Sequence, residues 1–198
     1  MRHTVPVFCL AISASVLAAC HRVEMPGMSY VPPDGWIRED PTSDNRLIQY
    51  RLRGQNKATE DARLVVYYFG EAGTGTVDAT IDRWAGQFVQ ENGRPSIEVA
   101  RVKHHETNGL VVHMIAVDGT YTAMTATGEH LNRPDRSMYA AVVYTDAGPY
   151  YFKVVGPTET VRYWSDSYKT LLASFEPEPI PMKSDKTPSE GSIKEATQ

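Results

Sequence analysis

Apolar and polar residues change their spacing several times between residues 34 and 176. Apolar positions largely alternate over residues 46–52 and become nearly continuous over residues 62–69, which predicts two strands, the second a central one. The spacing then changes to four, three and four residues, which predicts an amphipathic helix over residues 76–90 that ends at Asn92-Gly93. The apolar stripe of this helix consists of Val77, Ile81, Trp84 and Phe88.

Two hairpins are predicted in the second half of the chain. Residues 97–106 and 110–117 flank Asn108-Gly109, the favoured pair for a two-residue turn between strands. A second hairpin is predicted over residues 137–155, around a turn at residues 146–149. Because a hairpin pairs neighbouring strands antiparallel, we expect a mostly antiparallel sheet.

A last helix is predicted to begin at Gly156-Pro157, since proline is tolerated at the first helical position. We assign both Trp84 and Trp164 to the core. Two amphipathic helices need a sheet to cover, so the fold class is α+β: about six or seven mostly antiparallel strands with two helices packed on them. We expect one such domain, over residues 34–176. The stripe of the last helix consists of Val161, Trp164, Tyr168, Leu171 and Phe175.

The first 19 residues are typical of an export signal, with Arg2, an apolar stretch and small residues before Cys20. The ending Leu-Ala-Ala-Cys resembles the lipobox of bacterial lipoproteins, which implies cleavage before Cys20, acylation of that cysteine and anchoring in a lipid bilayer. His21 follows the cysteine, and the resemblance links inner-membrane retention to Asp at that position. The expected place is therefore the outer membrane, facing the periplasm, if the organism has two membranes.

The segments on either side of the predicted domain are polar. Residues 20–33 contain four Pro or Gly residues and are interpreted as a flexible spacer, and residues 177–198 as a disordered tail. Cys20 is the only cysteine left after cleavage, so an intramolecular disulfide is excluded. The net charge of −4 without a basic tract argues against nucleic-acid binding. We expect a monomer.

The predicted hairpin places two histidines opposite each other. With Asn108-Gly109 as the turn, His104 faces His113, and directly opposed residues have Cβ atoms about 4.5–5.5 Å apart. Two imidazoles at this spacing could share a zinc or copper ion if Glu106 or His130 supplied a third ligand. The alternative is that the two rings are simply partly buried members of a cross-strand pair.

Other candidate chemistry is sparse. The glycine-rich residues 70–75 lie between a strand and a helix, but they match neither phosphate-binding motif, so a flexible connection explains them. No catalytic motif occurs, and we expect a protein that is not an enzyme and has no cofactor; a hydrolase with dispersed catalytic residues is the alternative. Tyrosine is enriched at interfaces, so an exposed tyrosine cluster would mark a binding surface. The candidates are Tyr67, Tyr68, Tyr121, Tyr139, Tyr144, Tyr150 and Tyr151.

The chain carries three short motifs, at residues 83–88 (Arg-Trp-Ala-Gly-Gln-Phe), 117–121 (Val-Asp-Gly-Thr-Tyr) and 152–157 (Phe-Lys-Val-Val-Gly-Pro). They resemble a group of uncharacterised bacterial lipoproteins, and the element order over residues 34–175 resembles the PsbP-like fold. This resemblance implies a peripheral binding or assembly factor and supplies no catalytic residue. The predicted function is a membrane-anchored, non-enzymatic envelope lipoprotein that acts as a binding or assembly module. Its partner would be another envelope component, such as an envelope protein, and a metal-binding lipoprotein and a hydrolase are the alternatives.

Overall fold

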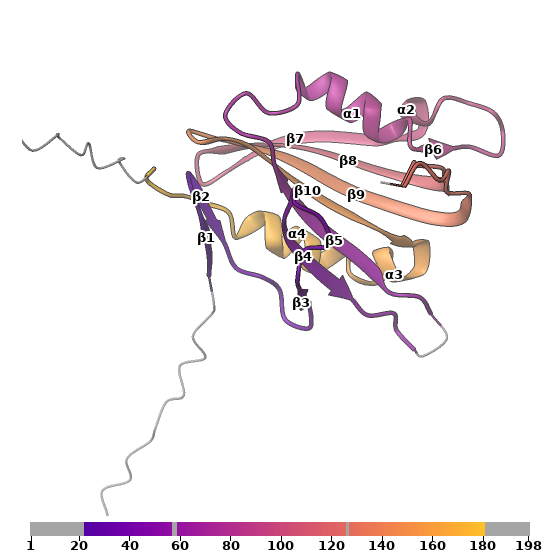
Figure 1. Ribbon diagram of the computed structural model, residues 1–198, viewed down its shortest axis with the longest axis horizontal. Helices are drawn as coiled ribbons and strands as arrows, with labels where there is room; N and C mark the ends of the chain where they lie inside the picture. The colour runs from indigo at the N-terminus through magenta and orange to yellow at the C-terminus, as the bar shows by residue number, and fades with distance from the viewer. Residues whose placement is uncertain (1–21, 57–58, 126, 181–198) are drawn as a thin grey trace, which may run out of the picture.

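The computed structural model describes residues 22–56, 59–125 and 127–180. Its main element is an eight-stranded antiparallel sheet (Figure 1). The α+β class with a mostly antiparallel sheet is therefore confirmed. In spatial order the strands are β3 (Ile37–Glu39), β4 (Arg46–Leu52), β5 (Ala62–Tyr68), β10 (Gly148–Pro157), β9 (Arg133–Thr145), β8 (Leu110–Tyr121) and β6 (Phe88–Val89), and β7 (Arg101–Thr107) also pairs with β8.

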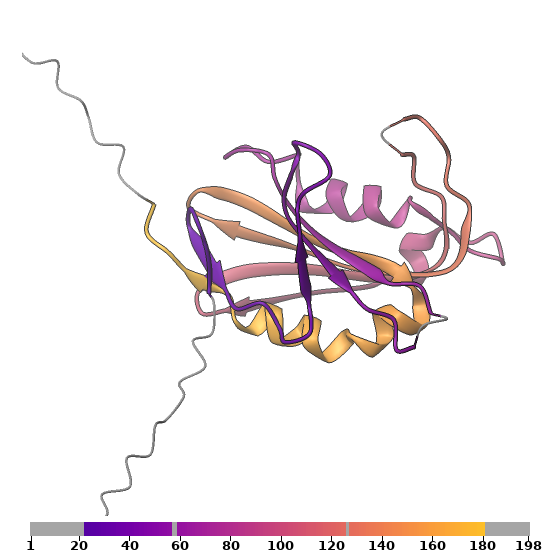
Figure 2. The same cartoon turned by 60° about the horizontal axis from the view of Figure 1, so that its bottom comes forward.

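Helices cover the sheet from both sides. Helices α1 (Val77–Ala85) and α2 (Ser96–Val99) lie above strands β7–β10 in Figure 1, and α3 (Thr158–Tyr163) and α4 (Ser165–Ala173) lie below these strands. The view in Figure 2 shows the same arrangement, with the sheet between the magenta and the orange helices. We refer to the two sides as the α1 face and the α4 face.

Strand alternation builds a separate core on each face. Along β10, Tyr150 and Phe152 point to the α4 face, and Tyr151 and Lys153 point to the α1 face, because successive side chains of a strand alternate. The three aromatic side chains are buried, and Lys153 is partly buried. This explains why the apolar pattern of the central strands is nearly continuous in the sequence.

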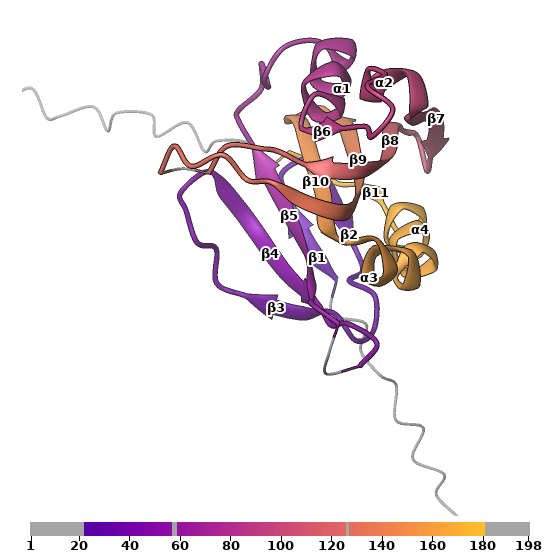
Figure 3. The same ribbon diagram turned by 90° about the vertical axis from the view of Figure 1, so that its right-hand side faces the viewer.

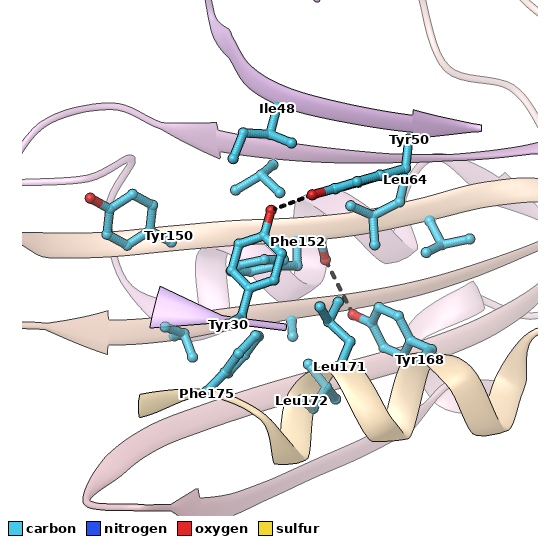
Figure 4. Close-up of a cluster of buried hydrophobic side chains, with 14 of the residues drawn as sticks. Tyr30, Ile48, Tyr50, Leu64, Tyr150, Phe152, Tyr168, Leu171, Leu172 and Phe175 are labelled. Atoms are coloured by element: carbon cyan, nitrogen blue, oxygen red, sulfur yellow. Dashed lines mark hydrogen bonds between the residues drawn. The ribbon is translucent and has the colours of Figure 1, made fainter. Parts of the chain in front are cut away.

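The larger core lies on the α4 face and is rich in aromatic rings (Figure 4). Tyr30 packs edge-on against Phe152 at a centroid distance of 5.4 Å and against Phe175 at 6.3 Å. Its hydroxyl shares a hydrogen bond of 3.1 Å with the Tyr50 hydroxyl. Tyr168 on α4 donates to the backbone oxygen of Phe152 at 3.3 Å, so the buried polar atoms of these rings are satisfied.

Residues 23–30 form a hairpin that packs into this core, so the flexible spacer predicted over residues 20–33 is wrong there. Strands β1 (Val23–Met25) and β2 (Met28–Tyr30) form a hairpin, and β11 (Glu176–Pro177) pairs with β2 to complete a small second sheet. The predicted tail is likewise wrong at its beginning, since the Glu178 carboxylate accepts a hydrogen bond of 2.6 Å from Ser29. The first and last described segments of the chain therefore lie side by side.

The predicted helices are shorter than expected. Helix α1 begins after Thr76, whose hydroxyl accepts a hydrogen bond from the Ala79 amide at 3.2 Å, and it ends at Gly86, not at residue 92. Phe88 leaves the helix to pair with Tyr121 as part of β6. The helical spacing of the sequence does not reveal this pairing, because the strand residue that pairs with Phe88 lies more than thirty residues away in the chain.

Two further elements differ in detail. The start of the predicted strand 97–106 is the helical turn α2, and the last helix is divided into α3 and α4 at Trp164. Trp84 is buried as expected, but Trp164 is only half-buried, and its indole nitrogen donates to the Arg53 backbone oxygen at 2.8 Å. The assignment of Trp164 to the core is therefore only partly right.

Both predicted hairpins are confirmed. Asn108 and Gly109 have φ values of 50° and 86°, the left-handed pair that a two-residue turn of this type requires. The second turn is tighter than expected, because Thr145 already pairs with Gly148.

Candidate functional site

One half of the α1 face is left open by its helix. Helix α1 packs Ile81 and Trp84 against side chains of β8, β9 and β10. Figure 3 shows α1 and α2 above these strands, whereas β3, β4 and β5 extend away from the helices. In strand register, Arg46 lies opposite Tyr67 and Arg51 opposite Arg63 on this open part of the face.

Two pockets lie on the open part. The first, which we call the lysine pocket, measures about 220 Å³ and is lined by Tyr67, Phe69, Thr74, Arg83, Trp84, Gln87, Tyr151 and Lys153. The second, the arginine pocket, measures about 370 Å³, and its charged lining consists of Arg51, Arg63, Arg133, Arg136, Glu60 and Asp61. We call the two pockets together with Arg46 the basic face. It concentrates cations in a chain whose net charge is −4.

The arginine pocket is largely neutralised by ion pairs. Each of its four arginines contacts a carboxylate, as the short distances show. These pairs are Arg51–Glu39 (2.7 Å), Arg51–Asp61 (3.3 Å), Arg63–Glu39 (3.6 Å), Arg133–Glu60 (3.3 Å) and Arg136–Glu60 (2.6 Å). Its cations therefore have carboxylate partners within the protein.

The cations at the lysine pocket have neutral partners instead. Lys153 Nζ donates to the side-chain oxygen of Gln87 and lies 5.6 Å from the ring centre of Tyr121. Within residues 22–56, 59–125 and 127–180, Lys153, Arg46 and Arg83 form no ion pair with a carboxylate. Positive charge at this pocket is thus uncompensated by the described residues.

Both arginines are held in place by polar side chains. Arg83 donates to the hydroxyls of Thr74 at 2.9 Å and Thr80 at 3.3 Å. Arg46 donates to the side-chain oxygen of Gln49 at 2.7 Å. A guanidinium carries five N–H donors, so each arginine keeps donors for a further acceptor.

Burial and neighbouring charges change the titration of the pocket. Burial, followed by the positive charges of Arg46 and Arg83, lowers the pKa of Lys153 to about 7. Burial also raises the pKa of Tyr121 to about 12 and the pKa of Tyr67 above its usual value. Among these groups, only Lys153 changes its charge near neutral pH.

Aromatic rings form the walls of the lysine pocket. Tyr67 and Phe69 stack with centroids 6.0 Å apart and planes 9° from parallel, and Trp84 meets Tyr151 edge-on at 6.2 Å. The Tyr151 hydroxyl accepts a hydrogen bond of 2.9 Å from the Thr74 amide, which ties the glycine-rich loop to the sheet. Phe69 remains 43% exposed, so its ring is accessible at the mouth of the pocket.

The lysine pocket is not predicted from the sequence, although one residue in the sequence points to it. Lys153 interrupts the otherwise apolar strand segment Phe152–Val155, and a charged residue within a buried strand is unusual. The partners of Lys153 could not be identified, because Arg46, Arg83 and Gln87 lie between 66 and 107 residues away in the chain.

The seven tyrosines do not form a single exposed cluster that would mark a binding surface. Tyr150 and Tyr151 are buried, and Tyr144 is the most exposed of the seven. Strand alternation divides the set between the faces: Tyr68 and Tyr150 stack on the α4 face, whereas Tyr67, Tyr121 and Tyr151 surround the basic face.

The histidine pair exists, but it lacks the expected third ligand. His104 pairs with His113 in register, and their ring centroids are 6.0 Å apart. No group of three His, Cys, Asp or Glu side chains suited to a metal ion occurs among the described residues, so neither Glu106 nor His130 completes a site. The structure therefore favours a cross-strand pair, with Tyr144 packed edge-on against His113 at 6.1 Å.

The glycine-rich loop at residues 70–75 serves packing. Gly73 has a φ of 62°, and a Cβ there would collide with the side chains of Pro149 and Tyr151. A close approach to the neighbouring hairpin therefore accounts for this glycine.

The lipidation site Cys20 and the predicted signal over residues 1–19 lie outside the described residues. In the part of the chain that the structure describes, no helix is both long and apolar enough to span a bilayer.

Comparisons with known proteins show similarity of fold at low sequence identity. No protein-family model and no curated protein matches the chain. The structure is similar to the solution structure of cyanobacterial PsbP (CyanoP) from Synechocystis sp. PCC 6803, with a TM-score of 0.45 and 14% identity over 77% of this chain and 87% of that one. It is also similar to PA94 from Pseudomonas aeruginosa, a protein of unknown function described as a putative regulator, with a TM-score of 0.46 and 9% identity over 76% of this chain and 92% of that one. The chain thus has structural similarity to the PsbP-like fold.

Proposed function

We propose that the protein is a non-enzymatic binding module of the cell envelope, anchored in a membrane through acylated Cys20, and that its basic face binds an acidic envelope component. The observation that supports this proposal is the lysine pocket. Its cations Lys153 and Arg83, together with Arg46, whose charge acts on Lys153, have no carboxylate partner among the described residues.

The residue types of the basic face suit recognition. Arginine, tyrosine and tryptophan are the residues that most often dominate binding energy at protein interfaces. Complementary charge also raises the rate of encounter with an acidic partner. A lipid anchor would restrict the search for that partner to the membrane surface, since a doubly acylated protein stays bound.

Site-specific photocrosslinking tests the binding surface. A photoreactive amino acid at Phe69, which is 43% exposed at the lysine pocket, is expected to give one discrete adduct with an acidic envelope component in intact cells. The matched control is the same amino acid at Tyr163, which is 55% exposed on α3 and lies on the opposite face. Mass spectrometry identifies the adduct, and Arg63→Glu is expected to reduce its yield.

Equal adducts from both positions would contradict a specific role for the basic face. An adduct from Phe69 that is unchanged by Arg63→Glu and by raised salt would contradict the charge complementarity, because exposed charges are screened by salt.

Lipidation is tested separately by metabolic labelling with a palmitate analogue. The wild-type chain is expected to carry the label and to sediment with membranes. Cys20→Ser is expected to lose both properties, since the acylated thiol is absent. Membrane association of Cys20→Ser equal to that of the wild type would exclude Cys20 as the anchor.

A further inference from the structure

The lysine pocket differs from the arginine pocket in a way that indicates a ligand. Both pockets lie on the α1 face and share Tyr121 as a neighbour, but only the arginine pocket contains its own counter-charges. A partly buried cation without a counter-charge is costly, and an anionic group that enters the pocket would relieve this cost.

Two cationic donors, Lys153 and Arg83, line the pocket, and the charge of Arg46 acts on Lys153. Lys153 lies on β10, Arg83 on α1 and Arg46 on β4, and the charges of both arginines act on the Lys153 amine. An amine and a guanidinium together can satisfy several oxygens of one carboxylate or phosphate group.

The walls of the pocket define the rest of the ligand. Tyr67, Phe69, Trp84 and Tyr151 present aromatic surface, and the accessible ring of Phe69 offers a stacking platform at the mouth. The volume of about 220 Å³ is below the range of about 300–1,000 Å³ for pockets that enclose drug-sized ligands, so the occupant is small.

We propose that the lysine pocket binds a small organic anion, a carboxylate or phosphate monoester attached to a flat apolar group, with Lys153 and Arg83 holding the anionic end and the aromatic walls holding the flat part. This inference rests on the proposed binding role of the α1 face and names the ligand class of one of its two pockets.

The pH dependence of binding follows from the groups that face Lys153. These are Arg46 on β4, Tyr67 on β5, Arg83 on α1, Tyr121 on β8 and Tyr151 on β10. An anion favours the charged amine, so binding is accompanied by proton uptake, and affinity falls as the pH rises above 7.

Calorimetric titration of the purified full chain tests the proposal with four probes: benzoate, phenyl phosphate, inorganic phosphate and the uncharged benzamide. Benzoate or phenyl phosphate is expected to bind at least tenfold more tightly than both benzamide and inorganic phosphate. If benzoate binds more tightly than phenyl phosphate, the preferred anionic group is a carboxylate, and in the opposite case it is a phosphate monoester. Lys153→Met and Arg83→Gln are each expected to weaken that binding at least tenfold. Benzoate affinity is expected to fall from pH 7 to pH 9 in the wild type only.

Two controls make the result specific. Lys103→Met and Arg101→Gln remove exposed cations of β7 that line a groove on the opposite face, and both should leave probe affinity unchanged. The free energy of unfolding of each variant shows whether a loss of binding reflects a loss of folding.

Equal affinity for benzamide and benzoate, or unchanged binding by a folded Lys153→Met variant, would overturn the proposal. The proposal would also be overturned if phenyl phosphate bound no more tightly than inorganic phosphate and benzoate bound no more tightly than benzamide. If the small-anion proposal failed in this way but the photocrosslink from Phe69 persisted, the proposed binding role of the basic face would still stand. The two experiments therefore test the two proposals separately.

Discussion

Tyr30→Ala is expected to lower the free energy of unfolding by about 3–5 kcal/mol, the range for truncation of a fully buried aromatic side chain. Tyr30 is 0% exposed and contacts the rings of Phe152 and Phe175. Its removal would leave a cavity at the centre of the larger core and would deprive the buried Tyr50 hydroxyl of its partner. Urea denaturation, followed by tryptophan fluorescence, measures the loss.

This experiment decides whether the first described residues belong to the fold. Tyr30→Phe keeps the ring and removes only the hydroxyl, so a loss of about 1 kcal/mol is expected. Tyr163→Ala, at a side chain that is 55% exposed, serves as the control and should change little. If Tyr30→Ala were as stable as the Tyr163→Ala control, the N-terminal hairpin would not be part of the cooperative unit.

Lys153→Met is expected to stabilise the protein at neutral pH, with an effect of several kcal/mol. Burial and the charges of Arg46 and Arg83 lower the pKa of Lys153 to about 7, whereas an unfolded chain leaves this amine near 10.5. A pKa difference of one corresponds to about 1.4 kcal/mol, so the upper limit of the effect is about 5 kcal/mol. Methionine keeps most of the length of the side chain without the charge.

The sign of the pH dependence follows from proton binding. Between about pH 7 and 10.5, the unfolded wild type holds the proton of Lys153 more often than the folded one, so the stability of the wild type rises with pH. The destabilisation is complete below pH 7 and vanishes above pH 10.5. The advantage of Lys153→Met should therefore shrink by up to about 1.4 kcal/mol per pH unit across this window.

Urea denaturation of both proteins at pH 6.5, 8 and 9.5 measures this difference. Subtracting the free energy of unfolding of the wild type from that of the variant removes the contribution of groups that titrate alike in both proteins. Lys103→Met, at an exposed position on β7, is the matched control and should show no such pH dependence. An advantage of Lys153→Met that stays constant with pH would show that the amine is not desolvated in the folded protein.

Local signals in the chain were sufficient for the turns and for the fold class. Asn108-Gly109 supplies the two left-handed residues of its turn, and this alone determined that His104 pairs with His113. The helical stripe likewise predicted α1 as far as Ala85. These features depend on residues that are close together in the sequence, so the spacing of apolar residues and the residue types of the turns are sufficient to predict them.

The sequence pattern gave wrong predictions where a segment far away in the chain determines the structure of a residue. Phe88 fits the stripe of α1 but pairs with Tyr121, and Trp164 fits the stripe of the last helix but lies where that helix divides. Residues 22–33 contain prolines and glycines that are typical of a spacer. Their apolar side chains Met25, Met28 and Tyr30 are nevertheless buried, because the hairpin packs them into the α4-face core.

The sequence by itself determined that this protein is an α+β domain with antiparallel hairpins, and it placed the two histidines opposite each other. Only the tertiary structure decided that the N-terminal hairpin closes the larger core, that the histidines lack a third ligand among the described residues, and that three cations gather without carboxylates at an aromatic pocket. The physical reason is distance along the chain. Hydrophobic period and turn chemistry act over a few residues. The lysine pocket instead joins residues of β5 and α1 with residues of β10, which is far from them in the chain, and no local pattern encodes that these elements meet.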